Sequence, residues 1–226
     1  MIKLKKQKKK ATPKRTLFIY KNLDNEYDFT CKSHFNLRYN GIEGRVEMRS
    51  TYPADVVGWQ TNMFLSRLLT NSLPFQDNFL LFLMFRVNSV KIEIHSTYEP
   101  DLYTNPYSFG HIIYGVRFYP TTDSLVINPF KIINDPRTMT VTTKKPFHSQ
   151  EIVFPKQYVI TSDAQGYGRW LSCEYNVLGH GIDGSLQIGT QYQGYWPTNI
   201  SIGLMTVTFG ITFKEIRSSG ILEELR

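Results

Sequence analysis

The chain is poor in cysteine and lacks any long apolar run. Cysteine occurs only at Cys31 and Cys173 among 226 residues, which is too few for a disulfide framework but leaves a single bridge open. No apolar stretch of about 7–15 residues follows the basic N-terminus, so no secretory signal is expected. The segment 184–213 has no formal charge, but polar residues, glycines and Pro197 interrupt it too often for a membrane span. These features favour synthesis in a reducing compartment.

Catalytic and metal-binding motifs are also missing. The five histidines fall in no HExxH or Cys/His zinc pattern, and there is no GxSxG or Walker lysine. The segment Gly179–Gly184 matches GxGxxG, but the residues after it predict a strand where a dinucleotide site needs a helix. The spacing of acidic pairs such as Asp24/Glu26 and Asp163/Glu174 does not select a Ca²⁺ site. We therefore expect no catalytic residue, no cofactor and no metal.

Positive charge is concentrated at the N-terminus. Of the 26 basic residues, eight lie in residues 1–15 with no acidic residue, which leaves 18 basic and 19 acidic residues in the rest of the chain. Like charges at this density repel, so residues 1–15 are predicted to be a disordered arm that binds nucleic acid through its phosphates. An import signal, an anionic membrane tether and a solvated tail are the alternatives. The predicted contacts are Lys3, Lys5, Lys6, Lys8, Lys9, Lys10, Lys14 and Arg15, with Lys32 and Arg38 as weaker candidates.

Period-two alternation predicts strands through the body, residues 16–226. Phe29, Cys31, Phe35 and Leu37 share one face of the first strand. Alternation near the C-terminus is longer, and its inward face is expected to hold Met205, Val207, Phe209, Ile211 and Phe213. In 81–94 the apolar set is Leu83, Phe85 and Val87, then Val90, Ile92 and Ile94, and this slip at Asn88–Ser89 predicts a β-bulge.

Further strands are expected at 112–118, 139–143, 157–160, 169–173 and 185–188. Only one stretch, from Trp59 to Leu69, approximates helical spacing, and it is expected to end before Asn71-Ser72-Leu73-Pro74. One short helix among about eight strands is typical of a single all-β domain, an antiparallel sandwich or jelly roll. The charge-poor aromatics Tyr192, Tyr195 and Trp196 are candidates either for a protein–protein interface or for core filling.

The order of segments resembles the circovirus-like coat proteins of circular single-stranded DNA viruses. The resemblance is carried by 85–94, by 134–149 with Phe154-Pro155-Lys156, by Arg169-Trp170-Leu171 and by the closing strand 203–214. It covers residues 80–215, and no single motif is diagnostic. The arm departs from the family, because it is short and Lys-rich where Arg is common, and lysine lacks the bidentate fork of arginine.

This resemblance implies an eight-stranded antiparallel jelly roll and a shell of sixty copies with T=1 symmetry. It also implies that the arms lie inside on single-stranded DNA. The family further implies assembly in the host nucleus, host import machinery and a host-surface receptor as partners, and residence in the virion. The arms of an empty shell would repel one another, so closure is expected to depend on nucleic acid.

Three alternatives remain open. The coat protein of a small RNA or satellite virus would have the same arm and sandwich. A monomeric jelly-roll binding module, lectin-like or cytokine-like, would use the arm as a signal or tether. An enzyme on a β-sandwich, acting through His180 or Asp183, is the third.

Overall fold

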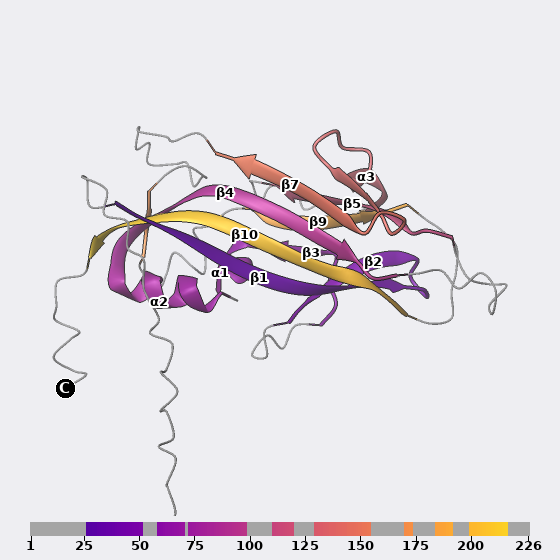
Figure 1. Ribbon diagram of the computed structural model, residues 1–226, viewed down its shortest axis with the longest axis horizontal. Coiled ribbons are helices and arrows are strands. Elements are labelled where there is room, and N and C mark those ends of the chain that lie inside the picture. Colours follow the sequence, from indigo (N-terminus) through magenta and orange to yellow (C-terminus); the bar gives the residue numbers. More distant parts are fainter. Residues whose placement is uncertain are drawn as a thin grey trace, which may run out of the picture.

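The protein is built from two antiparallel β-sheets that enclose one core (Figure 1). The computed structural model describes residues 26–51, 58–70, 72–98, 110–119, 129–154, 170–173, 184–191 and 199–216. The six-stranded sheet has the order β2(Arg45–Ser50), β1(Glu26–Asn40), β10(Ile200–Ile216), β4(Phe82–Ser96) and β7(Phe147–Val153), with β8(Leu171–Ser172) also paired to β4. The four-stranded sheet has the order β3(Asn62–Phe64), β9(Ser185–Thr190), β5(Ile113–Tyr119) and β6(Met139–Thr142).

The connectivity of these sheets is that of a jelly roll. When β2 and β8 are set aside, the remaining strands pair in the order β1-β10-β4-β7 in one sheet and β3-β9-β5-β6 in the other. Consecutive strands therefore alternate between the sheets, except for β5 and β6, which pair with each other in the four-stranded sheet. The first strand lies beside the last, as two interlocked Greek keys require. The predicted fold class is confirmed, with β2 and β8 as additions to the eight expected strands.

Alternation in the two longest pairings was predicted correctly. Cys31, Phe35 and Leu37 of β1 are fully buried, while Lys32, His34 and Asn36 are exposed. All five predicted inward residues of β10 are buried, from Met205 to Phe213. Strand pairing sets Phe35 opposite Met205 and Tyr27 opposite Phe213, so the two inward faces form one apolar surface.

The predicted β-bulge in β4 is confirmed. Gly210 of β10 pairs with Ser89 and Ile211 pairs with Val87, so Asn88 is the extra residue. Val87 and Val90 are both buried as a result, although they differ by three positions. One residue of the expected set was wrong: Leu83 is 43% exposed, because it lies at the start of β4 beside the exposed end of a helix.

The expectation of one helix was also wrong. The described residues contain α1(Leu65–Thr70), α2(Leu73–Leu81) and α3(Pro129–Ile132). The first part of the expected helix is instead β3, where Met63 pairs with Leu186 of β9. Helix α2 was missed because Pro74 was interpreted as a helix stop, whereas it occupies the first turn, where proline costs no hydrogen bond.

Aromatic side chains fill the end of the core where β1 begins. Helix α2 lies beneath this end of the six-stranded sheet (Figure 1). The ring of Phe75 packs edge-on against Phe85 at 5.4 Å and tilted against Phe213 at 5.9 Å. Phe79 joins the same cluster from the next turn of the helix. Such contacts favour stability beyond buried area alone, and they account for part of the high aromatic content.

Two strands carry too little signal in the sequence to have been predicted. Strand β7 reads Phe-His-Ser-Gln-Glu-Ile-Val, and as an edge strand it alternates only between exposed and half-buried positions. In β2, Val46, Glu47 and Met48 are all buried, so period two is lost. The predicted strand 157–160 lies outside the described residues. Cys31 and Cys173 are both buried thiols.

Candidate nucleic-acid interface

The first described residue is Glu26, where β1 starts opposite Lys214 near the end of β10. All eight predicted arm contacts in residues 1–15 lie outside the described residues, so their role stays a prediction. At this end of the six-stranded sheet lie the first ends of β1 and β4 and the last part of β10. The side of this sheet that faces away from the core is called the outer face below.

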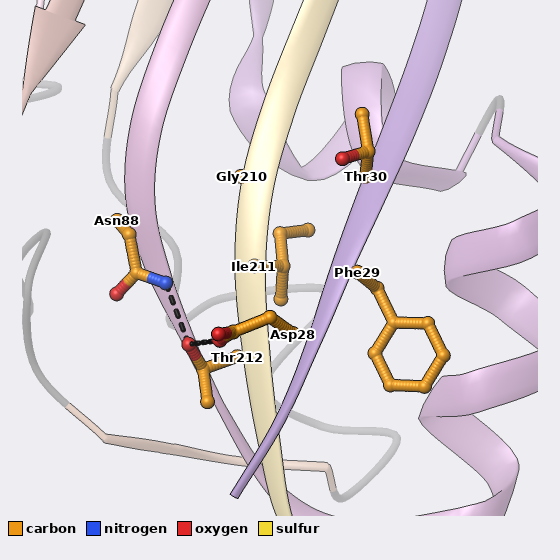
Figure 2. A pocket seen from close by; sticks show the side chains of 7 residues that line it. All are labelled: Asp28, Phe29, Thr30, Asn88, Gly210, Ile211 and Thr212. Atoms are coloured by element: carbon orange, nitrogen blue, oxygen red, sulfur yellow. Dashed lines mark hydrogen bonds between the residues drawn. The ribbon is translucent and has the colours of Figure 1, made fainter. Parts of the chain in front are cut away.

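A chain of polar contacts crosses three strands on the outer face at this end. Arg86 of β4 contacts Glu26 through Nη2 at 3.3 Å and donates from Nε to Oδ1 of Asn88 at 3.0 Å. Asn88 Nδ2 donates to Thr212 Oγ1 at 2.6 Å, and this hydroxyl donates to Asp28 Oδ1 at 2.6 Å (Figure 2). Asn88, the residue that the bulge adds to β4, contacts both Arg86 and Thr212. Its side-chain amide therefore joins the Arg86–Glu26 contact to the Thr212–Asp28 contact.

Trp170 stands beside two cations at the same end of the sheet. The guanidinium carbon of Arg86 lies 4.4 Å from the centre of the Trp170 ring, and Lys214 Nζ lies 4.5 Å from it. Arg86 is almost fully buried, and its charge is balanced by Glu26. Arg86 therefore stabilises the junction between β1, β4 and β8 and is poorly placed to bind phosphate.

A hollow of about 350 Å³ lies next to this network. Gly210 is one of its lining residues, and a Cβ there would come within 2.6 Å of Ser89 Oγ, so a larger residue would require the Ser89 side chain to move. The lining combines apolar side chains with hydroxyl and amide groups and one carboxylate. It contains no basic side chain, so the hollow does not suit a phosphate group. Its lining residues are Asp28, Phe29, Thr30, Asn88, Gly210, Ile211 and Thr212 (Figure 2).

The structure separates the two weaker candidates, Lys32 and Arg38. Lys32 is exposed on β1 opposite Thr208, and among the described residues it has no ion-pair partner. Arg38 contacts Glu47 of β2 at 2.9 Å and 3.0 Å, and its guanidinium carbon lies 4.2 Å from the centre of the Trp59 ring. Because Glu47 is only 3% exposed, Arg38 neutralises a buried carboxylate.

Arg49 is a further exposed cation that the sequence analysis missed. It lies on β2 opposite Asn36, and so it faces the same side as Lys32. The sequence could have indicated Arg49 only through a predicted strand at 45–50, and no strand was predicted there because the residues of β2 do not alternate. Lys32 and Arg49 are thus the outer-face cations best placed to contact a polyanion.

Several other predicted features lie wholly or partly outside the described residues. These are Tyr192, Tyr195, Trp196, His180 and Asp183. Of the GxGxxG segment only Gly184 is described, and it leads directly into β9, which confirms that a strand follows it. The parts of the chain that the structure describes contain no cluster of three metal-ligating side chains. Among those same parts, no helix is long and apolar enough to cross a membrane.

Comparisons with known proteins identify the fold. No protein-family model and no curated protein matches the sequence. Solved virus structures do match, among them Cocksfoot mottle virus, with a TM-score of 0.56 and 7% identity over 85% of this chain and 97% of that chain. The chain has a viral jelly-roll fold.

Two further structures support the same statement. A semi-empty virus-like particle of the Macrobrachium rosenbergii nodavirus has a TM-score of 0.52 and 7% identity, covering 86% of this chain and 96% of that one. Tobacco necrosis virus has a TM-score of 0.52 and 9% identity, covering 86% and 98%. At such low identities the likeness concerns the fold alone. None of these three is a circovirus, so they lend no support to the finer family resemblance.

Proposed function

We propose that this chain is a viral capsid protein that assembles into a small icosahedral shell of sixty copies. The observation that carries the proposal is a viral jelly-roll connectivity joined, at its first strand, to an arm with eight basic and no acidic residues. The rest of the chain is close to neutral, so copies of it can approach one another without a large repulsive field.

In this proposal the arm binds single-stranded nucleic acid through its phosphates. Lysine attracts phosphate as a point charge, and the binding releases condensed counter-ions whatever the base sequence. With eight charges engaged on a single strand, log K should fall with log salt at a slope of about −5.6. Lys32 and Arg49 extend the same positive path onto the outer face, whereas Arg38 and Arg86 do not.

The chemical identity of the nucleic acid has arguments on both sides. The resemblance in segment order favours single-stranded DNA, and nuclear assembly belongs to that possibility. The similar solved structures come from RNA viruses, which favours the alternative of an RNA virus coat. Extraction of nucleic acid from purified particles, followed by DNase or RNase treatment, distinguishes the two. A fusion of residues 1–15 to a fluorescent protein tests the nuclear possibility separately.

Electron microscopy of the expressed protein tests assembly. We expect closed shells from the full chain with nucleic acid, and loss of encapsidated nucleic acid when residues 1–15 are deleted. Size-exclusion chromatography can refute the capsid proposal. A stable 26 kDa species at every salt and protein concentration would refute the capsid proposal and favour the monomeric binding module.

A matched pair of variants tests the arm itself. Lys5→Gln with Lys6→Gln removes two arm charges, and Lys144→Gln with Lys145→Gln removes two exposed charges from the turn between β6 and β7. The arm pair should reduce the salt slope of oligonucleotide binding by about 1.4, and the turn pair should leave it unchanged. Equal effects of the two pairs would contradict the assignment of binding to the arm.

A further inference from the structure

Helix α2 is apolar on both of its sides. Phe75 and Phe79 point into the core, whereas Leu73, Leu80 and Leu81 are 55%, 67% and 55% exposed. Leu80 and Leu81 follow Leu73 by seven and eight residues, so the three side chains lie on one side of the helix. A surface helix normally turns a polar side to water, and a helix that is apolar all round is normally buried.

The exposed leucines of α2 continue onto the ends of two strands. Leu83 of β4 is 43% exposed and Ile216 of β10 is 59% exposed. Ile216 pairs with Phe82, the residue directly after α2, so β10 ends at the C-terminus of this helix. Five of the nine exposed large apolar side chains among the described residues gather here, which is more than scattered surface residues require. This leucine face consists of Leu73, Leu80, Leu81, Leu83 and Ile216.

The last ten residues of the chain, 217–226, begin at the leucine face. Their sequence is Arg-Ser-Ser-Gly-Ile-Leu-Glu-Glu-Leu-Arg, with apolar residues at Ile221, Leu222 and Leu225. Five extended residues span about 17 Å, and the nine residues of α2 measure about 14 Å. The apolar residues of the segment are therefore within reach of the whole leucine face.

We propose that residues 221–225 pack against the leucine face of the same chain. Covalent attachment favours this occupant over a second copy, because the segment continues directly from Ile216 and so meets the leucine face at a high effective concentration. Asp77 is exposed on the same side of α2, four residues after Leu73. Charge does not distinguish the two occupants, since the segment contains Glu223 and Glu224 and a two-fold contact would bring a second Asp77. The inference is independent of the proposed capsid function.

Hydrogen exchange measured by mass spectrometry on dilute protein tests the packing. The full chain is compared with a chain that ends at Ile216 and with Leu222→Asp, while Ser219→Asp serves as a matched control for the added charge. Loss of the segment should speed exchange of the amides of residues 73–83 by about tenfold, the factor that burial of one leucine supplies. The control should exchange like the full chain. Adding a peptide of residues 217–226 should restore protection to the shortened chain.

Two outcomes would overturn the proposal. One is equal exchange in the full and the shortened chain at every concentration. The other is protection of residues 73–83 that rises with protein concentration whether or not the segment is present, which would assign the leucine face to a second copy. Far-UV circular dichroism of each variant separates a loss of packing from a loss of fold. A disulfide between Leu80→Cys and Leu222→Cys gives a second readout, since it should form in the monomer.

Discussion

Replacement of Arg38 by glutamine should destabilise the fold, because it removes the main partner of a buried carboxylate. Arg38 makes two contacts with Glu47, at 2.9 Å and 3.0 Å, and Glu47 is 3% exposed. Loss of one partner from a buried ion pair costs about 3–5 kcal/mol. Arg45 and Asn40 still contact Glu47 at 3.0 Å and 3.2 Å, which reduces the expected cost to about 2 kcal/mol.

Arg38 also lies over the Trp59 ring, which adds about 0.5–1 kcal/mol. The total of about 3 kcal/mol corresponds to a fall in melting temperature of about 6–12 °C for a domain of this size. Urea unfolding followed by tryptophan fluorescence measures the free energy of unfolding directly. A double-mutant cycle with Glu47→Gln should give a coupling energy of about 2 kcal/mol.

Lys32→Gln provides the matched control on the same strand and face. It should change the free energy of unfolding by less than about 0.5 kcal/mol, because Lys32 is exposed. If Lys32 contacts phosphate, the same variant should reduce the salt slope of oligonucleotide binding by about 0.7. A free-energy change below about 0.5 kcal/mol for Arg38→Gln would refute the assignment of Arg38 to stability.

Three further predictions concern acid stability, packing and thiol reactivity. Hydrogen bonds from Arg137 and the charge of Arg117 lower the pKa of Asp135, so its stabilisation is complete above the unfolded value of about 3.9 and is lost as pH falls further. In Asp135→Asn the free energy of unfolding should therefore depend less on pH below about 3.9 than in the unchanged protein. Gly115→Ala should cost about 1–3 kcal/mol in thermal unfolding, because a Cβ would overlap Thr138 Cγ2, whereas Gly110→Ala meets open space. Burial raises the pKa of Cys31 to about 11, so this thiol should resist alkylation at pH 8 until the protein unfolds, and rapid labelling of native protein would contradict its burial.

The parts of the fold predicted from the sequence are those where one side of a strand meets the core. The sequence predicted the alternation of β1 and β10 and the bulge at Asn88. In these strands burial decides which positions must be apolar, so the pattern of apolar residues shows which side faces the core. Helix α2 was missed because its exposed leucines break the amphipathic pattern. Pro74 was interpreted as the end of a helix, whereas proline is also favoured in the first turn, which is where it lies. Strand β7 was missed because an edge strand does not need an apolar face.

The candidate interface shows a different limit of sequence analysis. Lys32 and Arg38 look equivalent in the sequence, since both lie on the polar face of one strand. Their difference depends on β2, whose register sets Glu47 opposite Arg38 and Arg49 opposite Asn36. Whether a cation is available to a ligand is thus a property of strand pairing, which composition and periodicity do not contain.

Pairing of charges within the body explains why phosphate binding is expected of the arm. Arg86 is paired with Glu26, Arg38 with Glu47, and Lys91 with Glu93 at 2.6 Å, so these three cations of the outer face already have carboxylates beside them, whereas Lys32 and Arg49 are exposed. Such paired charges create little long-range field, and adding salt changes them less than it changes a separate polycation. Salt should therefore weaken the attraction between arm and nucleic acid while leaving contacts between bodies largely intact. In the proposed function the arm binds nucleic acid and the body makes the contacts between copies, so we expect a change in the arm to alter nucleic-acid binding and leave the contacts between bodies in place.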